Sequence, residues 1–197
     1  ARSSCSCRTL AASAVAPPSL FRILSPPTFI ALVCKILTPA LAALPPDAAV
    51  QFFTSEVSPL VASIQDSHVF LSSSPLPANN AACVGRITSM MVLETMFRVV
   101  PPDAIKSRIN SAFVTNTAGA AAAASAVGKE LTEKLIRICL ATRAATTSTP
   151  DTVDPRFLLL LRQRAYCCLV AVVTATQRQE KLFAQLLLKE KSGDLWH

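Results

Sequence analysis

The chain has 197 residues, enough for one ordinary domain or for part of a longer array. Hydrophobic residues make up 51% of it and charged residues 16%, a balance that excludes a disordered tail and predicts a packed core. The net charge of +7 permits attraction to an acidic partner such as nucleic acid, but no run of consecutive Lys or Arg concentrates it.

The first 27 residues combine Arg, Ser and Ala with two proline pairs and contain no acidic residue. Such a composition is typical of a transit peptide, yet the prolines disfavour the amphipathic helix that one needs. We therefore expect residues 1–27 to be poorly ordered or extended, and residues 28–197 to form one helical segment. The chain starts at Ala1 and stops at His197, which favours a piece of a larger scaffold.

Helix-length blocks follow, separated by prolines. Residues 28–44 predict a helix that is bent or broken at Pro39, because proline removes a backbone donor. Pro46 and Asp47 then give a favourable helix start. The apolar residues after it recur at spacings of three and four: Val50, Phe53, Val57, Leu60, Val61 and Ile64.

The middle of the chain predicts a loop and two further helices. Residues 72–80, rich in Pro and Asn, read as the loop, and residues 81–99 as a helix. Its inward positions are Val84, Ile87, Met91, Met96 and Phe97. A second proline pair with Asp103 starts a short helix that carries Ile105, Ile109, Ala112 and Phe113. The alanine-rich residues 118–127 predict either a helix extension or a loop insertion.

Residues 129–145 form the clearest amphipathic pattern, with Leu131, Leu135, Ile138 and Cys139 on one face. The pairs Glu130 with Lys134 and Glu133 with Arg137 stand at favourable i,i+4 spacing. After a loop at residues 146–154, Asp154 and Pro155 predict an N-cap and a first turn. The apolar stripe of the next helix consists of Leu158, Leu161, Ala165, Cys168, Leu169 and Val172. The helix is predicted to break near residues 174–177. A second stripe follows the break, at Leu182, Phe183, Leu186 and Leu187.

These blocks predict an all-α fold without a sheet. Stacked antiparallel helix pairs, as in a HEAT-like α-solenoid, fit the spacing best, with a compact bundle as the alternative. The longest uncharged window, residues 109–128, contains Asn, Thr, Ser and Gly, so we expect no transmembrane helix.

Catalytic and metal chemistry find little support in the sequence. The isolated glycines, His68 and His197 form neither a phosphate loop nor a catalytic triad, so no catalytic residue is assigned. The seven cysteines lack the paired spacing of a zinc site, and we expect free thiols that mostly act as small buried apolar groups: Cys5, Cys7, Cys34, Cys83, Cys139, Cys167 and Cys168. We predict no metal and no cofactor in this segment.

Weak phosphate or DNA contacts are the remaining binding hypothesis. Five cations near the C-terminal end could touch phosphates without reading bases, although solvated surface positions explain them as well: Arg156, Arg162, Arg164, Arg178 and Lys181. Thr176, followed by Gln177, is a candidate phosphorylation site.

Several blocks, in this order, resemble a known family: KSRINSAF at residues 106–113, ELT at 130–132, LIRIC at 135–139, AYC at 165–167 and EKLF at 180–183. They are similar to the middle helical-repeat region of the DNA-dependent protein kinase catalytic subunit family, within the phosphatidylinositol 3-kinase-related kinases. The alanine-rich residues 118–127 and the loop at 146–152 depart from that pattern.

The resemblance implies a nuclear serine/threonine kinase that acts with the Ku heterodimer at DNA ends in non-homologous end joining. It implies further that this segment is a non-catalytic scaffold, with ATP and Mg in the parent's kinase domain only, and that no membrane is involved. The alternative is a stand-alone armadillo-like or importin-like module that binds an acidic protein.

Overall fold

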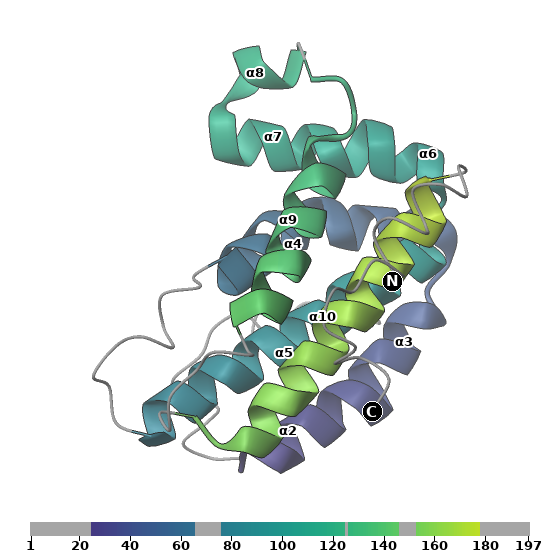
Figure 1. Cartoon of the computed structure of the whole chain (residues 1–197). Coiled ribbons are helices and arrows are strands. Elements are labelled where there is room, and N and C mark those ends of the chain that lie inside the picture. The colour runs from purple at the N-terminus through teal and green to yellow at the C-terminus, as the bar shows by residue number, and fades with distance from the viewer. Residues whose placement is uncertain (1–24, 66–75, 125, 146–152, 178–197) are drawn as a thin grey trace.

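The computed structural model describes residues 25–65, 76–124, 126–145 and 153–177. Across these ranges the chain is helical and contains no strand, as predicted. Figure 1 shows the arrangement. The elements, in chain order, are α2 (Pro26–Leu32), η2 (Val33–Leu37), α3 (Thr38–Ala42), α4 (Pro46–Gln65), α5 (Leu76–Val99), α6 (Pro102–Ala104), η4 (Ile105–Ile109), α7 (Asn110–Ala118), α8 (Ala120–Ala124), α9 (Glu130–Ala145) and α10 (Pro155–Thr176).

The first helical stretch begins at Pro26, two residues before the predicted start, with Ser25 as its N-cap. It is not broken at Pro39. Instead, the π-helical turn η2 lies just upstream, and Thr38 N–H bonds to the carbonyl of Val33, five residues back. In that register the Cys34 carbonyl would face Pro39, which has no N–H. The Thr38 hydroxyl donates to it at 3.0 Å, so no acceptor is left open.

The π turn also explains the spacing of buried residues. Phe29, Val33, Leu37 and Leu41 recur every four residues and are all buried. In a regular α-helix each such step rotates the face by about 40°, so the stripe would drift around the helix. A π turn holds more residues than an α turn and offsets this drift. The turn η4 does the same for Ile105, Ile109 and Phe113, all of which are buried.

The core centres on α5. Every predicted inward residue of α4 and α5 is buried. The structure adds that α5 is enclosed on nearly all sides from residue 83 to residue 97, including Thr88, Ser89 and Glu94. Thr88 donates its hydroxyl to the carbonyl of Val84, and Ser89 shares a 2.7 Å hydrogen bond with Ser63 of α4. The hydroxyl groups of Thr88 and Ser89 are therefore satisfied inside the core.

The start of α5 corrects the predicted loop at residues 72–80, because the helix already begins at Leu76. Pro77 falls in its first turn, where a missing N–H costs nothing. The Asn80 side chain then accepts a hydrogen bond from the backbone of Asp154 at 3.0 Å. The remaining predicted loop residues up to 75, and those at 146–152, lie outside the described part of the chain.

Helices α5 and α10 run parallel, as three contacts along their length show. Asn80 contacts Asp154, the Cys83 thiol approaches the Phe157 carbonyl, and Glu94 approaches Arg164. Helix α9 is antiparallel to α10, since Cys139 meets Cys168 and Arg143 lies over the ring of Tyr166. Figure 1 shows α9 and α10 side by side, with α5 behind them.

The alanine-rich segment neither extends α7 nor forms a simple loop. Gly119 ends α7 with a φ of 89°, which favours glycine, and the chain returns as the separate helix α8. In Figure 1, α8 lies on the outer side of α7. Its core contribution is small, as expected for an alanine helix.

Helix α10 confirms the predicted N-cap and end. The Asp154 side chain accepts from Arg156 N–H at 2.8 Å, and Gln177 ends the helix in an extended conformation. By length and composition α10 is also apolar enough to cross a membrane, although no transmembrane helix was predicted from the sequence. Its stripe from Leu161 to Val172 is buried against α5 and α9, so we interpret it as a core helix.

Candidate functional site

The candidate phosphate-contacting cations do not gather on one surface in the described structure. Arg156 is exposed in the first turn of α10, whereas Arg162 and Arg164 are half-buried. Arg178 and Lys181 lie outside the described residues. Contact with DNA therefore stays a prediction.

Arg164 takes part in a polar cluster between α10 and α5. Glu94 is nearly buried, its Oε1 lies 2.6 Å from Arg98, and its Oε2 lies 3.8 Å from Arg164. A buried carboxylate needs such partners, because desolvation without them is costly. The cluster thus ties the middle of α5 to α10, a role that the sequence did not reveal because the two helices are about 70 residues apart.

The described cysteines are free thiols, as predicted. Burial raises the pKa of Cys83 to about 12, and its thiol donates to the Phe157 carbonyl at 3.6 Å. A hydrogen bond with Cys139, together with burial, raises the pKa of Cys168. Burial also raises the pKa of the half-buried Cys167. Thiols held in the neutral form are poor nucleophiles and ligands, which fits a packing role.

A second polar cluster, the Glu130 clasp, joins α7 to α9. The Glu130 carboxylate accepts the backbone N–H groups of Val127, Gly128 and Lys129 at 2.7, 3.1 and 3.0 Å. It also accepts from the Asn110 amide at 2.7 Å, while Asn110 Oδ1 accepts the N–H of Leu131 at 2.9 Å.

The N–H groups, that of Val127 foremost, lower the pKa of Glu130 to about 2. This arrangement replaces the predicted pairing with Lys134. Glu133 likewise pairs with Lys129 at 3.1 Å, on the N-terminal side of the predicted partner Arg137. Both glutamates thus point back toward the start of α9, where the helix dipole favours negative charge.

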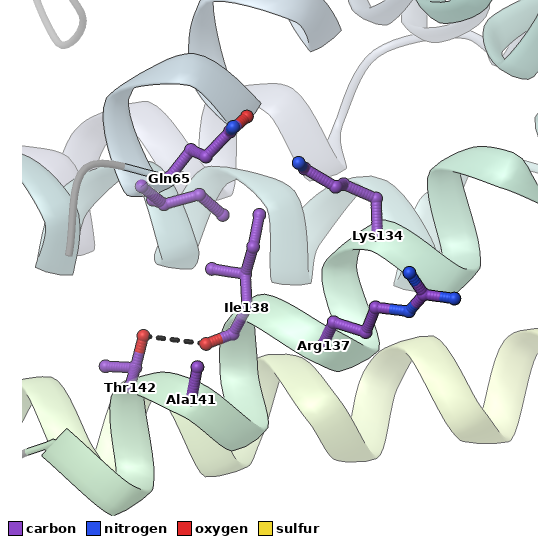
Figure 2. Close-up of a pocket in the computed structure, with 7 residues that line it drawn as sticks. Gln65, Lys134, Arg137, Ile138, Ala141 and Thr142 are labelled. Carbon is purple, nitrogen blue, oxygen red and sulfur yellow. Dashed lines mark hydrogen bonds between the residues drawn. The ribbon is translucent and has the colours of Figure 1, made fainter.

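A cleft of about 220 Å³ lies between the end of α4 and the middle of α9. Figure 2 shows Lys134 and Gln65 directed toward one another across it, with Ile138 and Ala141 below. Its lining residues are Ile64, Gln65, Lys134, Arg137, Ile138, Ala141 and Thr142. No sequence pattern pointed to this cleft, because its two sides are separated by about 70 residues.

Two other sequence candidates carry less information. Thr176 is the last residue of α10, half-buried, and its hydroxyl donates to the Val172 carbonyl at 2.6 Å. Its phosphorylation stays a prediction. His68, His197, Cys5 and Cys7 lie outside the described residues, within which no group of three His, Cys, Asp or Glu residues is placed to hold a metal ion.

A comparison with known families matches most of the chain. Residues 30–196 match the model described as DNA-dependent protein kinase catalytic subunit, CC3. The chain belongs to this family. Neither the curated proteins nor the solved structures yield a match. The match confirms the family predicted from the sequence blocks, and it reaches back to residue 30, well before the first block at residue 106.

In this member of the CC3 family, the described residues form a packed helical body with a shallow cleft. The conspicuous polar groups stabilise contacts between helices: Glu94 joins α5 to α10, and Glu130 joins α7 to α9.

Proposed function

We propose that this CC3-family chain is a non-catalytic helical scaffold segment of a DNA-dependent serine/threonine protein kinase that acts in DNA double-strand break repair by non-homologous end joining. The family match over residues 30–196 carries this proposal. The packed helices support it, because their polar groups form contacts between helices.

The scaffold is proposed to be a HEAT-like α-solenoid. Two helix pairs support this: α4 with α5, and α9 with α10. Their second helices, α5 and α10, run parallel and in contact, which is how equivalent helices of successive repeats stack. A compact bundle does not require this parallel packing.

Partners and cofactors are proposed for the parent protein. We propose that the parent acts in the nucleus with the Ku heterodimer and DNA ends, without membrane attachment, and the family match supports this. ATP and Mg belong to the parent's kinase domain, and this segment contacts the rest of the kinase chain.

Two experiments test the proposal. The 197-residue chain should give a helical circular dichroism spectrum and no saturable ATP binding by isothermal titration; tight ATP binding would contradict it. In the full-length kinase, Leu161→Asp should lower DNA-stimulated phosphorylation of a peptide, because it places a charge in the buried core around α10. Leu159→Asp, at an exposed position of the same helix, is the matched control. Equal activity of the two variants would exclude a supporting role.

The stand-alone acidic-protein-binding module remains the alternative. A complete transcript that continues from this chain into a kinase domain would exclude it, whereas a transcript that codes for this chain alone would favour it.

A further inference from the structure

The cleft between α4 and α9 combines an apolar floor with cations that have no partner in the described structure. Ile64, Ile138 and Ala141 supply apolar surface, and Lys134 and Arg137 supply positive charge. None of the residues that line it is acidic. We propose that this cleft binds a short protein segment in which an acidic residue flanks an aliphatic one.

The charge of the cleft follows from the capping at the start of α9. Glu130 is held by three backbone N–H groups and by Asn110, and Glu133 pairs with Lys129. Both carboxylates that helical spacing would place near Lys134 and Arg137 are therefore engaged elsewhere. Within the described ranges, no ion pair involves either cation.

The two cations lie three residues apart and so share a face of α9. Lys134 is half-buried and Arg137 is exposed, so both remain accessible to a ligand. Arg137 can hold a carboxylate with two parallel hydrogen bonds, while Lys134 adds a point charge. Gln65, exposed at the end of α4, adds an amide on the opposite side.

The floor selects a side chain in addition to a charge. Thr142 donates its hydroxyl to the Ile138 carbonyl at 2.8 Å, as Figure 2 shows, so its donor is engaged within α9. The volume of about 220 Å³ is below the range of about 300–1,000 Å³ for small-molecule sites. One aliphatic side chain with a neighbouring carboxylate fits these limits. A phosphate backbone would leave the apolar floor uncovered, so nucleic acid is disfavoured.

The test uses the 197-residue chain and a fluorescein-labelled decapeptide of alternating Leu with Asp or Glu. Saturable fluorescence anisotropy is expected. The double variant Lys134→Glu/Arg137→Glu should weaken binding roughly tenfold, since two attractions become repulsions. Lys106→Glu/Arg108→Glu is the matched control, because it makes the same charge change at exposed residues of η4. Its affinity should stay within about twofold of the unmodified chain.

Two further measurements address the floor. Ala141→Trp fills the cleft from an exposed position, so it should abolish binding without unfolding α9, as checked by circular dichroism. A peptide with Ser in place of Leu should bind more weakly than the Leu peptide. Equal loss in both charge variants, or equal binding of the Ser peptide, would overturn the proposal. Stronger binding of single-stranded DNA of equal charge would assign the cleft to nucleic acid instead.

Discussion

The contact between α5 and α10 and the contact between α7 and α9 join helices in different ways. Between α5 and α10, buried apolar side chains and a thiol meet along parallel helices, and a charged cluster at Glu94 lies among them. Between α7 and α9, one carboxylate and one amide, Glu130 and Asn110, hold four backbone N–H groups.

The difference concerns which conditions weaken each contact. Burial depends on shape and area and is insensitive to moderate changes of pH. The Glu130 clasp depends on directed hydrogen bonds to an ionised group, so one protonation step weakens it. A fall in pH should therefore weaken the contact between α7 and α9 more than the contact between α5 and α10.

The largest effect is expected from Leu161→Ala in α10. Leu161 is fully buried in the helical core, and its truncation leaves a cavity that should lower the free energy of unfolding by about 2–5 kcal/mol. Leu159→Ala, at a residue 69% exposed on the same helix, should stay within about 0.5 kcal/mol. Urea unfolding followed by circular dichroism measures both. Similar losses would show that α10 is not anchored through this face.

Asn110→Ala should cost about 1–3 kcal/mol, because it removes the acceptor of the buried Leu131 N–H. The matched control is Asn116→Ala on α7, an exposed residue whose amide donates to Ser58 at 3.2 Å. Hydrogen exchange should also accelerate at the Leu131 amide in the Asn110 variant. Unchanged exchange there would contradict the clasp.

Glu130→Gln should have a smaller effect, because the carboxylate is partly exposed and water can replace some of its contacts. Its depressed pKa, about 2 against the usual 4.5, contributes stability that is present above pH 4.5 and is lost as the pH falls toward 2. The difference in unfolding free energy between the unmodified chain and the variant should therefore shrink across that window. A difference that is constant with pH would mean that ionisation plays no part.

Thiol modification should have the smallest effect on stability, and it shows which parts of the helical core open to solvent. Among the cysteines that the structure describes, iodoacetamide at neutral pH should alkylate the exposed Cys34 first and leave Cys83, Cys139 and Cys168 protected, as read by peptide mass spectrometry. Alkylation of Cys34 should change the free energy of unfolding by less than about 0.5 kcal/mol. Unfolded chain in urea, where every thiol reacts, is the control. Rapid labelling of Cys168 in the native chain would mean that α9 and α10 separate readily.

The sequence predicted what local signals determine. Pro46 with the apolar spacing of α4, and Asp154 with Pro155 at the start of α10, combine a cap with a periodic stripe. Both operate within a few residues, so a single sequence shows them. The all-helical fold followed from the same kind of signal, whereas the family was predicted from the ordered residue blocks between residues 106 and 183.

Long-range placement was not predictable in this way. The spacing of Glu130 and Lys134 fits an ion pair, but the path of the preceding loop brings three N–H groups to the carboxylate instead. Likewise, nothing near Glu94 indicates that Arg164 approaches it. The α4–α9 cleft depends on the same long-range packing. The sequence shows the π turns only as apolar residues spaced four apart. Short stretches of that spacing also occur in ordinary α-helices, so the π turns were not predicted.

The turn η4 bears on how this chain can change length over evolution. A π turn is an α-helix with one additional residue in its ladder. Removing Ser107, whose neighbours Lys106 and Arg108 are also exposed, would return the segment to α geometry and leave Ile105 and Ile109 three residues apart on one face. A chain one residue shorter at this point would therefore keep α7 in place, whereas the same deletion in the middle of α5 would rotate every following side chain by about 100°.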